Sequence, residues 1–499
     1  MESRISLNME KLSHLFNNSL YLLLVVSFLL GNHVSFYFHF LTVTFFLLIL
    51  INIYYLYIQK QHALLSNFGL LAQIRYMVES VGPEFRQYLF MSDTEERPFT
   101  RIERNEIYRK AKNVDSSAAF GSQLNFDHTE IKLRHSMYPM DKSRLRPFEL
   151  VFGEERALAR SHVITKPLMI SAMSYGTLGS HAVRALARGA RKAGITMNTG
   201  EGGFPKYHLM ENCDLVFQMG TAKFGVRHED GTLDDDKLEK LAALEQIKMI
   251  EIKFSQGAKP GKGGLLPREK ITEEIALLRG VPMDRDVVSP AYHAECTSPE
   301  ASVKFIRHVQ EVAQLPVGIK MCLGRPDELG ALLREMKAQL VFPDYMVIDG
   351  AEGGTGAAPK AFMDDFGLPL FTALPLVEKL LREEGVRNRL KLLSSGKLIH
   401  AGRQFTALSL GTDAIYTARG FLLAIGCIQS LQCNNNTCPV GITTQDPALQ
   451  KGLDIEQKSQ RVANYVNNLW HDHREMLAAM GKTTHRQLNP DNVYIPQPF

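Results

Sequence analysis

The first part of the chain is apolar over a long stretch without a charged residue. No Asp, Glu, Lys or Arg occurs from Leu12 to Gln59, a run of 48 residues. A helix that crosses about 30 Å of hydrocarbon needs about 20 residues, so a single helix would be too long. Gly31-Asn32-His33 is a natural break in this run. We therefore predict a transmembrane helical hairpin within residues 1–60, with spans near residues 15–30 and 34–58.

Cations flank this hairpin but are absent from its turn. Arg4 and Lys11 precede it, and Lys60 and Arg75 follow it. Because cytoplasmic loops are enriched in Lys and Arg, this pattern predicts that both ends, and the body that follows, lie on the cytoplasmic side of the inner (cytoplasmic) membrane. The alternatives are a cleaved signal peptide, a single anchor and a buried pair of core helices. The signal peptide is disfavoured because no Ala precedes Ala63 to form a cleavage site.

After the hairpin, the pattern of apolar and polar positions changes twice. Residues 61–146 form a mixed connecting segment on the cytoplasmic side, with a helix predicted over residues 70–80 that ends at Gly82-Pro83. The polar run 92–113 is typical of a solvated or docking surface. After Pro147, short apolar runs alternate with stretches of helical period, which indicates repeated βα units.

Eight strands are predicted in this body, at residues 167–171, 194–199, 249–254, 286–290, 317–321, 345–350, 390–396 and 413–418. Eight strands alternating with helices indicate an α/β fold, a (β/α)8 TIM barrel over residues 147–454, followed by a C-terminal helical tail at 455–499. We interpret residues 203–248 as an insertion after the second strand. A doubly wound sheet is the alternative, but no G-x-G-x-x-G sequence follows a strand.

Composition changes this interpretation little. Lys+Arg 57 against Asp+Glu 53 gives a net charge of +4, which excludes a basic nucleic-acid-binding body. Six cysteines in 499 residues are too few for a disulfide scaffold. Cys427, Cys433 and Cys438 are spaced C-x5-C-x4-C. In a reducing cytoplasm, this spacing favours a metal or cluster site over a disulfide.

The loops after the predicted strands are rich in Gly, Ser and Lys. Gly-rich loops after the last two strands of a TIM barrel bind phosphate through backbone N–H groups. A phosphate-bearing cofactor is therefore expected near Gly396, Lys397, Arg419 and Gly420. For any one loop, the alternative is a tight turn without a ligand.

Two lysines lie inside apolar strands. Lys253 occurs in EIKF and Lys320 in GIKM. Burying a lysine is costly unless its ammonium group meets an anion, so the pair indicates a lined pocket. An edge strand or a side chain that extends to solvent is the alternative for each.

From about Pro147 to Asp454, the sequence resembles the FMN-binding synthase domain of glutamate synthase. Five motifs carry the resemblance, the last of them most specifically: SAMSYGTLG (171–179), NTGEGG (198–203), KFSQGAKPGKGGLLP (253–267), DGAEGGTGAAP (349–359) and CIQSLQCNNNTCPVGITTQ (427–445). With the hairpin ahead of this domain, the chain is similar to stand-alone FMN-binding glutamate synthase family proteins.

The resemblance implies FMN on the barrel rim and a [3Fe-4S] cluster on Cys427, Cys433 and Cys438. Thiolates are the usual ligands of iron–sulfur clusters, and three of them suit a cluster that lacks one iron. The zinc alternative would need a fourth ligand, and the motif contains no His.

The same resemblance assigns the substrate site. It implies that Lys253, Gln256 and Arg279 bind 2-oxoglutarate, and that Glu201 acts with Lys253 in catalysis, as a proton donor or by orienting ammonia. A loop carboxylate paired with a nearby cation is the alternative for Glu201. The implied flavin contacts are Ala172, Met173, Ser174, Thr199 and Lys320 for the ring, and Gly354, Gly396 and the turn 418–420 for the phosphate.

Two parts of complete glutamate synthases are not expected here. The first 145 residues are too short and too hydrophobic for a glutamine amidotransferase domain, so we expect free ammonia, an amine or a separate amidotransferase as nitrogen source. No dinucleotide fingerprint marks a route for NADPH electrons, so a ferredoxin or a reductase subunit is the expected donor.

We therefore hypothesise the synthase half-reaction. Electrons enter through the cluster, and reduced FMN converts a 2-imino acid, formed from 2-oxoglutarate and ammonia or an amine, to glutamate or an N-substituted glutamate. The alternatives are a membrane-tethered iron–sulfur flavoprotein that relays electrons to a quinone or another substrate, and a degenerate binding or scaffold subunit.

Two residues depart from the resemblance. Lys262 stands where the glutamate synthases are expected to carry Glu, which reverses a charge near the substrate lip. Cys296 stands where they carry no cysteine, and it is either an inert core thiol or a substrate contact. Both departures bear on the specificity for glutamate.

Overall fold

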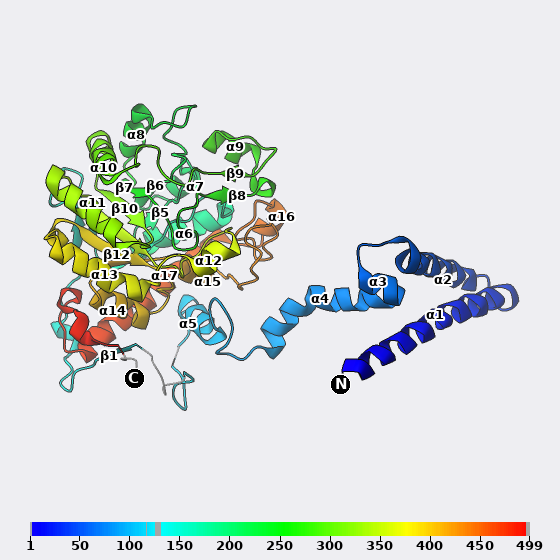
Figure 1. The fold of residues 1–499 in the computed structure, drawn as a ribbon. Coiled ribbons are helices and arrows are strands. Elements are labelled where there is room, and N and C mark those ends of the chain that lie inside the picture. The colour runs from blue at the N-terminus through cyan, green and yellow to red at the C-terminus, as the bar shows by residue number, and fades with distance from the viewer. Residues whose placement is uncertain (1, 116, 125–130, 496–499) are drawn as a thin grey trace. The chain divides into compact units, whose positions relative to one another are not determined.

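The computed structural model describes residues 2–115, 117–124 and 131–495. The chain divides into two compact units, one up to Arg101 and the other from Ile102 on (Figure 1). The division falls earlier than the predicted domain boundary at residue 146. The reason is that helix α5 (Arg101–Ala111) packs on the second unit, where Asn468 Nδ2 donates to Lys110 O at 2.9 Å.

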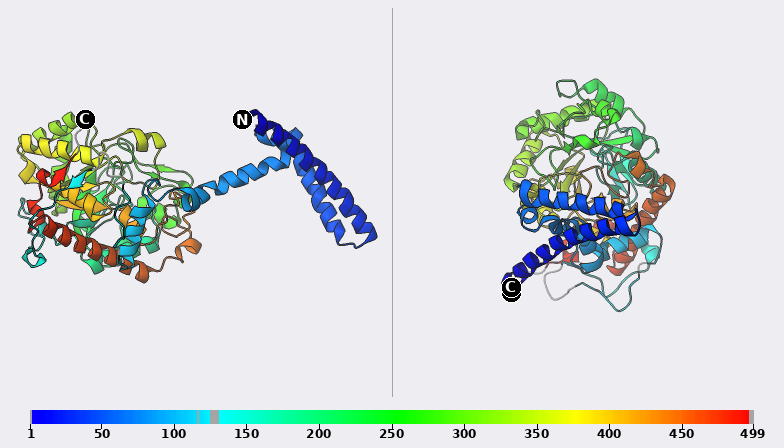
Figure 2. Two further views of the ribbon diagram at one scale, coloured as in Figure 1. Left: turned by 90° about the horizontal axis from the view of Figure 1, so that it is seen from below. Right: turned by 90° about the vertical axis from the view of Figure 1, so that its right-hand side faces the viewer.

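The first unit begins with two long antiparallel helices, α1 (Glu2–His33) and α2 (Phe38–Ile53), the latter extended by a π-helical turn, η1 (Tyr54–Ile58). They run side by side (Figure 2). The stretches Lys11–His33 and Phe38–Ile58 are long and apolar enough to cross a bilayer. Most of their side chains are exposed, which contradicts the alternative of a buried core pair.

Polar contacts tie the two helices together. Asn52 Nδ2 donates to Asn17 Oδ1 at 3.0 Å, and the Thr42 hydroxyl donates to Ser27 Oγ at 3.2 Å. The unit continues with short helical elements: α3 (Ala63–Phe68), η2 (Gly69–Ala72), α4 (Gln73–Phe85) and η3 (Arg86–Phe90). Pro83 lies inside α4, so the helix does not end at Gly82-Pro83 as predicted.

The second unit is built on a closed parallel barrel, which confirms the predicted fold. Its strands follow one another around the barrel in chain order, and helices cover the outside (Figures 1 and 2). The strands are β4 (Leu168–Ile170), β5 (Met197–Asn198), β6 (Leu215–Met219), β7 (Ile247–Lys253), β10 (Val317–Met321), β11 (Tyr345–Asp349), β12 (Lys391–Ser395) and β13 (Ala414–Thr417).

One predicted strand is wrong and one was missed. β6 lies in the segment interpreted as an insertion, and all five of its residues are buried. Residues 286–290 contribute only β9 (Val287–Val288), which pairs antiparallel with β8 (Leu265–Leu266) outside the barrel. Val288 is 61% exposed, whereas a strand of this barrel is buried on both faces. The long insertion therefore follows β7, not the second strand.

The helices largely match the helical periods of the sequence. They are α6 (Ser180–Ala193), α7 (Lys206–Leu209), α8 (Asp235–Ala242), α9 (Glu273–Arg279), α10 (Pro299–Ala313), α11 (Pro326–Gln339), α12 (Lys360–Asp365), α13 (Leu370–Glu383), α14 (Ala401–Ser409), α15 (Arg419–Ala424), α16 (Pro447–Gln450) and α17 (Ile455–Ala479). α17 lies close along α6, where a Cβ on Gly189 would come within 2.4 Å of Val462. After α17, β14 (Val493–Tyr494) pairs with β1 (Lys132–Leu133).

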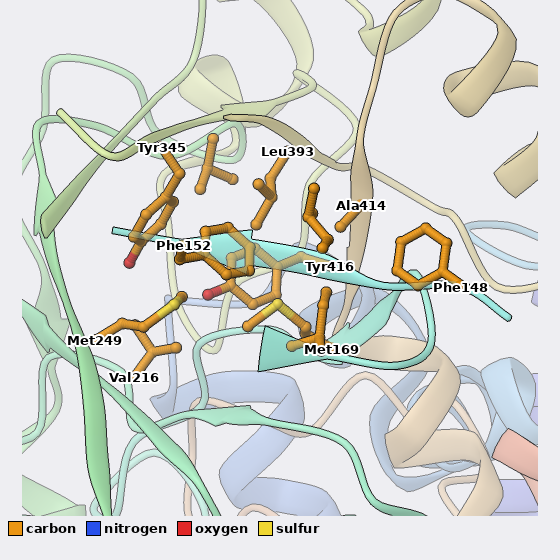
Figure 3. Packing of buried hydrophobic residues seen from close by; sticks show 12 residues of the cluster. Phe148, Phe152, Met169, Val216, Met249, Tyr345, Leu393, Ala414 and Tyr416 are labelled. Atoms are coloured by element: carbon orange, nitrogen blue, oxygen red, sulfur yellow. The ribbon is translucent and has the colours of Figure 1, made fainter. Parts of the chain in front are cut away.

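An apolar plug covers the amino-terminal end of the barrel. The hairpin of β2 (Leu150–Phe152) and β3 (His162–Ile164) packs on apolar side chains of the barrel strands (Figure 3). The rings of Phe152 and Tyr345 meet edge to face at 5.5 Å. This end is therefore closed by apolar packing, and the chemistry has to lie at the opposite rim.

Candidate active site at the carboxyl rim of the barrel

The predicted site residues come together at the carboxyl ends of the strands. Lys253 is the last residue of β7, and Lys320 is the last but one of β10. Both are buried in a closed barrel, which has no edge strand, so the alternatives of an edge position and of extension to solvent are wrong.

Lys253 is held by two oxygens. Its Nζ donates to Glu201 Oε1 at 2.7 Å and to Gln256 Oε1 at 2.6 Å. Two glycines leave room for the carboxylate: a Cβ on Gly220 would lie 2.1 Å from Glu201 Oε2, and one on Gly264 would lie 2.8 Å from Oε1. Gly220 directly follows β6, the strand that the sequence analysis missed.

Cations determine the charge of Glu201. Burial alone would raise its pKa, but Lys253, Lys259 and Arg279 outweigh that effect, so the pKa of Glu201 lies below its ordinary value. The group is therefore a carboxylate at neutral pH. Three cations facing one carboxylate leave a surplus of two positive charges, which matches a dicarboxylate ligand.

Arg279 reaches this cluster from the last residue of α9. Its Nη2 donates to Tyr175 O at 2.8 Å, and Gly176, at φ +100°, leaves space for the guanidinium. Burial lowers the pKa of Arg279 to about 10, so it remains charged at neutral pH. Its Nε is buried and makes no hydrogen bond to any residue that the structure describes.

Lys259 belongs to the same cluster and was missed by the sequence analysis. Its Nζ donates to Ala357 O at 2.9 Å. Burial, and secondarily the charge of Lys253, lower the pKa of Lys259 to about 8, while Glu201 raises it. Its position could have identified it from the sequence, because Lys259 lies in the Gly-rich loop after β7, six residues beyond Lys253.

The predicted ring contacts lie at the carboxyl ends of three strands: Ala172, Met173 and Ser174 after β4, Thr199 after β5, and Lys320 near the end of β10. Lys320 Nζ lies 3.9 Å from Asp349 Oδ2 and makes no hydrogen bond within the described ranges. The loops that carry Met173–Ser174 and Thr199 are packed backbone to backbone, because a Cβ on Gly200 would lie 2.7 Å from Ser174 N. Ala172 is half-buried in the first of these loops. Lys320 thus has donors to spare for an electron-rich ligand at this rim.

The predicted phosphate contacts gather around Glu352. Arg419 donates to its carbonyl, and Arg403 Nη2 lies 3.8 Å from its carboxylate. Burial lowers the pKa of Lys397, and Arg419 and Arg403 lower it further, so these three cations lie near one another. A Cβ on Gly354 would lie 2.8 Å from Arg419 Nε, and Gly396 has φ +138°. Gly420 follows at the start of α15. The three cations outnumber the neighbouring carboxylates of Glu352 and Glu103, so the set keeps a net positive charge that fits a phosphate.

The three cysteines lie on one loop after α15, and all six cysteines of the chain are free thiols. Burial raises the pKa of Cys427 to about 12, although Gln429 N donates to its Sγ at 3.4 Å. Burial also raises the pKa of Cys438, but hydrogen bonds from Thr443 and the backbone amides of Val440 and Ile442 bring it below its ordinary value. Such N–H donors to sulfur suit a thiolate ligand.

The loop is also strained. Gln429, Leu431 and Asn436 have φ values of 60°, 58° and 64° although none is glycine. Left-handed non-glycine residues of this kind cluster at functional sites. Among the described residues, no group of three or more His, Cys, Asp or Glu side chains is gathered as it would be around a metal ion, the three cysteines of this loop included.

Two further residues brace this loop and were not found from the sequence. Lys270 is buried, donates from Nζ to Thr177 O at 3.0 Å, and faces Cys433 and Cys438; burial lowers its pKa to about 8 and the two thiols raise it. Tyr108 on α5 donates to Cys427 O at 2.6 Å. Part of the run predicted to be a solvated or docking surface is therefore packed on the cysteine loop, which fits the docking alternative for that part.

The sequence from residue 102 to 483 matches the family described as "Conserved region in glutamate synthase". The chain belongs to this glutamate synthase family. A member from Bacillus subtilis, "Glutamate synthase large subunit-like protein YerD", is 37% identical over 462 residues, covering 85% of this chain and 88% of its own.

A second glutamate synthase relative matches a shorter part of the chain. "Archaeal glutamate synthase [NADPH]" of Methanocaldococcus jannaschii is 37% identical over 318 residues, which span 63% of this chain and 59% of that protein. Among solved structures, a mutant flavocytochrome b2 with benzoylformate is similar at a TM-score of 0.48 and 13% identity, covering 79% of each chain.

The two departures from the glutamate synthase motifs have different surroundings. Lys262 is exposed, and its Nζ lies 5.4 Å from the centre of the Phe362 ring. Cys296 is half-buried, and burial raises the pKa of its thiol to about 12. A protonated thiol is a poor nucleophile, which fits the inert alternative for Cys296.

Proposed function

We propose that this protein is a glutamate synthase-like oxidoreductase. It reduces a 2-imino acid, formed from 2-oxoglutarate and ammonia or an amine, to L-glutamate or an N-substituted glutamate. The observation that carries the proposal is the cluster of Lys253, Lys259 and Arg279 around the single carboxylate of Glu201. Family membership and the names of the relatives support the same reaction.

Each member of the cluster has a distinct task in this proposal. Arg279, fixed on Tyr175 O, offers the rest of its guanidinium to one substrate carboxylate, and Lys259 faces the other. Gln256 and Glu201 fix the ammonium group of Lys253 in one position, from which it can polarise the 2-oxo or imino group.

The proton steps fall to Glu201. Its carboxylate is ionised and buried, so it can accept a hydrogen bond from incoming ammonia and orient the nitrogen lone pair. Once the two substrate carboxylates neutralise the surplus positive charge, the pKa of Glu201 is less depressed, so it can take up a proton released as the imine forms and return it later. Lys253, at 2.7 Å, stabilises the charged form between these steps.

FMN is the cofactor that the rim fits, and when bound it supplies a hydride donor. Ala172, Met173, Ser174, Thr199 and Lys320 would hold its ring, and Gly354, Gly396, Lys397, Arg419 and Gly420 its phosphate. Lys320 has no hydrogen-bond partner among the described residues and would stabilise negative charge on the ring.

A [3Fe-4S] cluster on Cys427, Cys433 and Cys438 would supply single-electron transfer. The buried loop, the N–H donors to sulfur and the buried cation Lys270 support this assignment. We expect a ferredoxin or a reductase subunit as electron donor, and free ammonia or a separate amidotransferase as nitrogen source.

We further propose that residues 11–58 tether the protein to the cytoplasmic membrane. The two apolar helices, with cations on both outer flanks and none in the turn, support a hairpin with its ends in the cytoplasm. Extraction of the full-length protein from membranes by detergent, but not by high salt or alkaline carbonate, is the expected behaviour.

The test of the reaction is anaerobic. The bound flavin is reduced, and its reoxidation is followed with a panel of 2-oxo acids, each with and without ammonium or an amine. Rapid reoxidation that needs both 2-oxoglutarate and ammonium is expected. If flavin and iron are present but this pair leaves the flavin reduced, the substrate assignment is wrong, and the panel identifies the true 2-oxo acid or amine.

A further inference from the structure

The helix that follows the hairpin carries an exposed apolar stripe. Five large side chains of α4 recur at intervals of three and four residues, which puts them on one face of the helix. They are Ile74 (53% exposed), Met77 (61%), Val78 (58%), Val81 (41%) and Phe85 (51%). The apolar residues Tyr88, Leu89 and Phe90 of η3 are exposed as well. A contiguous exposed apolar face of this kind marks a surface that a membrane, a protein or a ligand covers.

The charges of this segment balance. Arg75 and Arg86 are matched by Glu79 and Glu84, and no other Asp, Glu, Lys or Arg occurs between Gln73 and Phe90. Whatever covers the stripe is therefore recognised by its apolar surface and not by its charge.

Hydrogen bonds to the second apolar stretch fix the level, relative to the end of that stretch, at which η2 and α4 begin. Leu70 N donates to Asn52 Oδ1 at 2.6 Å, and Gln73 Nε2 donates to Tyr55 Oη at 2.9 Å. Asn52 and Tyr55 precede the end of the second apolar stretch, Ile58, by six and three residues. At 1.5 Å per residue, these contacts lie roughly 9 Å and 5 Å inside that end. The chain therefore turns back to the level at which interfacial helices lie in a bilayer.

A hollow lies beside the same helix. It has a volume of about 550 Å³ and is lined mostly by apolar side chains, among them Phe16 of α1, Leu70 and Leu71 of η2, and Ile74 and Met77 of α4. It thus joins the first apolar helix to the start of the stripe.

We propose that α4 and η3 form an interfacial membrane helix, with the stripe turned into the acyl chains of the bilayer and a lipid chain in the hollow. The inference rests on the membrane tether proposed above. A bilayer is the occupant that the observations favour, because the hollow joins the stripe to the first apolar helix and because the segment begins at the depth of the interface.

Tryptophan depth measurement tests this inference. Trp470 is the single native tryptophan and provides the baseline. Full-length Val78→Trp, Glu79→Trp and Leu47→Trp are reconstituted separately in phosphatidylcholine vesicles with bromines near the headgroup or near the chain end. Val78 lies on the stripe, Glu79 is its charged neighbour on another face, and Leu47 lies near the middle of the second apolar stretch.

The expected result is several-fold stronger quenching of Val78→Trp than of Glu79→Trp, most by bromines near the headgroup, and unaffected by salt. Leu47→Trp should be quenched most by bromines near the chain end. FMN content and circular dichroism equal to the wild type show that each variant is folded.

The two proposals fail differently. Quenching of Leu47→Trp without preferential quenching of Val78→Trp overturns the interfacial helix, leaves the tether standing, and means that protein covers the stripe, either the rest of this chain or a second copy. Absence of quenching at Leu47→Trp overturns the tether, and the interfacial helix with it.

Discussion

Lys253 and Lys320 stand directly opposite each other on the neighbouring parallel strands β7 and β10. Because strand residues in register project to the same face of a sheet, two buried ammonium groups lie side by side at one rim. They have different partners: Lys253 donates to Glu201 at 2.7 Å, whereas Lys320 forms no hydrogen bond among the described residues and faces the carboxylates of Asp349, at 3.9 Å, and of Glu251. We infer that Lys253 serves the substrate and that Lys320 serves the ring of the cofactor.

Replacing Lys253 should separate catalysis from cofactor binding. Lys253→Met removes the cation next to Glu201, and the rate of flavin reoxidation by 2-oxoglutarate and ammonium should fall about 100-fold. FMN content should not change, because the ring contacts remain. The exposed Lys304→Met is the matched control. Loss of FMN in Lys253→Met would instead assign this lysine to the cofactor site.

Glu201 should make the barrel sensitive to acid. Its pKa is depressed in the folded state, so its contribution to stability is present above its ordinary pKa and is lost as pH falls through the folded value. Glu201→Gln should therefore melt below the wild type at pH 7, and the difference should shrink below about pH 4. Thermal melting across this range measures the effect, with the exposed Glu245→Gln as control; a constant difference would contradict it.

Lys259 should give substrate binding an alkaline limit. It is a cation below its pKa of about 8 and neutral above it, so the affinity for 2-oxoglutarate should weaken as pH rises through that value. Lys259→Met should bind more weakly at pH 7 and lose this pH dependence. Titration of the flavin spectrum with 2-oxoglutarate at several pH values measures both. If the affinity of Lys259→Met still weakened as pH rises through about 8, the pH dependence would belong to another group.

The cysteine loop should be separable from the barrel. Cys427→Ser should lose iron and acid-labile sulfide while it keeps FMN and a folded barrel, because Cys427 follows the last strand and lies outside the apolar plug. Cys296→Ser, a half-buried thiol elsewhere, should keep its iron. Unchanged iron content in Cys427→Ser would refute the ligand set.

Lys270 should raise the reduction potential of the iron–sulfur cluster proposed on the three cysteines. A buried cation beside Cys433 and Cys438 favours the more negative, reduced state of a cluster. Lys270→Met should lower the reduction potential, by about 60 mV for each 1.4 kcal/mol of lost stabilisation, and Lys270→Arg should restore most of it. Potentiometric titration followed by electron paramagnetic resonance gives the values. Equal potentials in Lys270→Met and the wild type would leave this lysine a purely structural role.

The sequence by itself determined the barrel, seven of its strands and the polar rim, because strand runs, helical periods and Gly-rich strand ends are local patterns. It could not distinguish β6 from the segment 286–290. Both are short apolar runs, and only closure of the barrel decides which one is buried on both faces. It predicted Lys253 and Gln256 through a motif and Arg279 through the family resemblance of the helix that follows, but not Lys259 or Lys270. Their importance depends on burial and on neighbours distant in sequence, and only the tertiary structure brings those together.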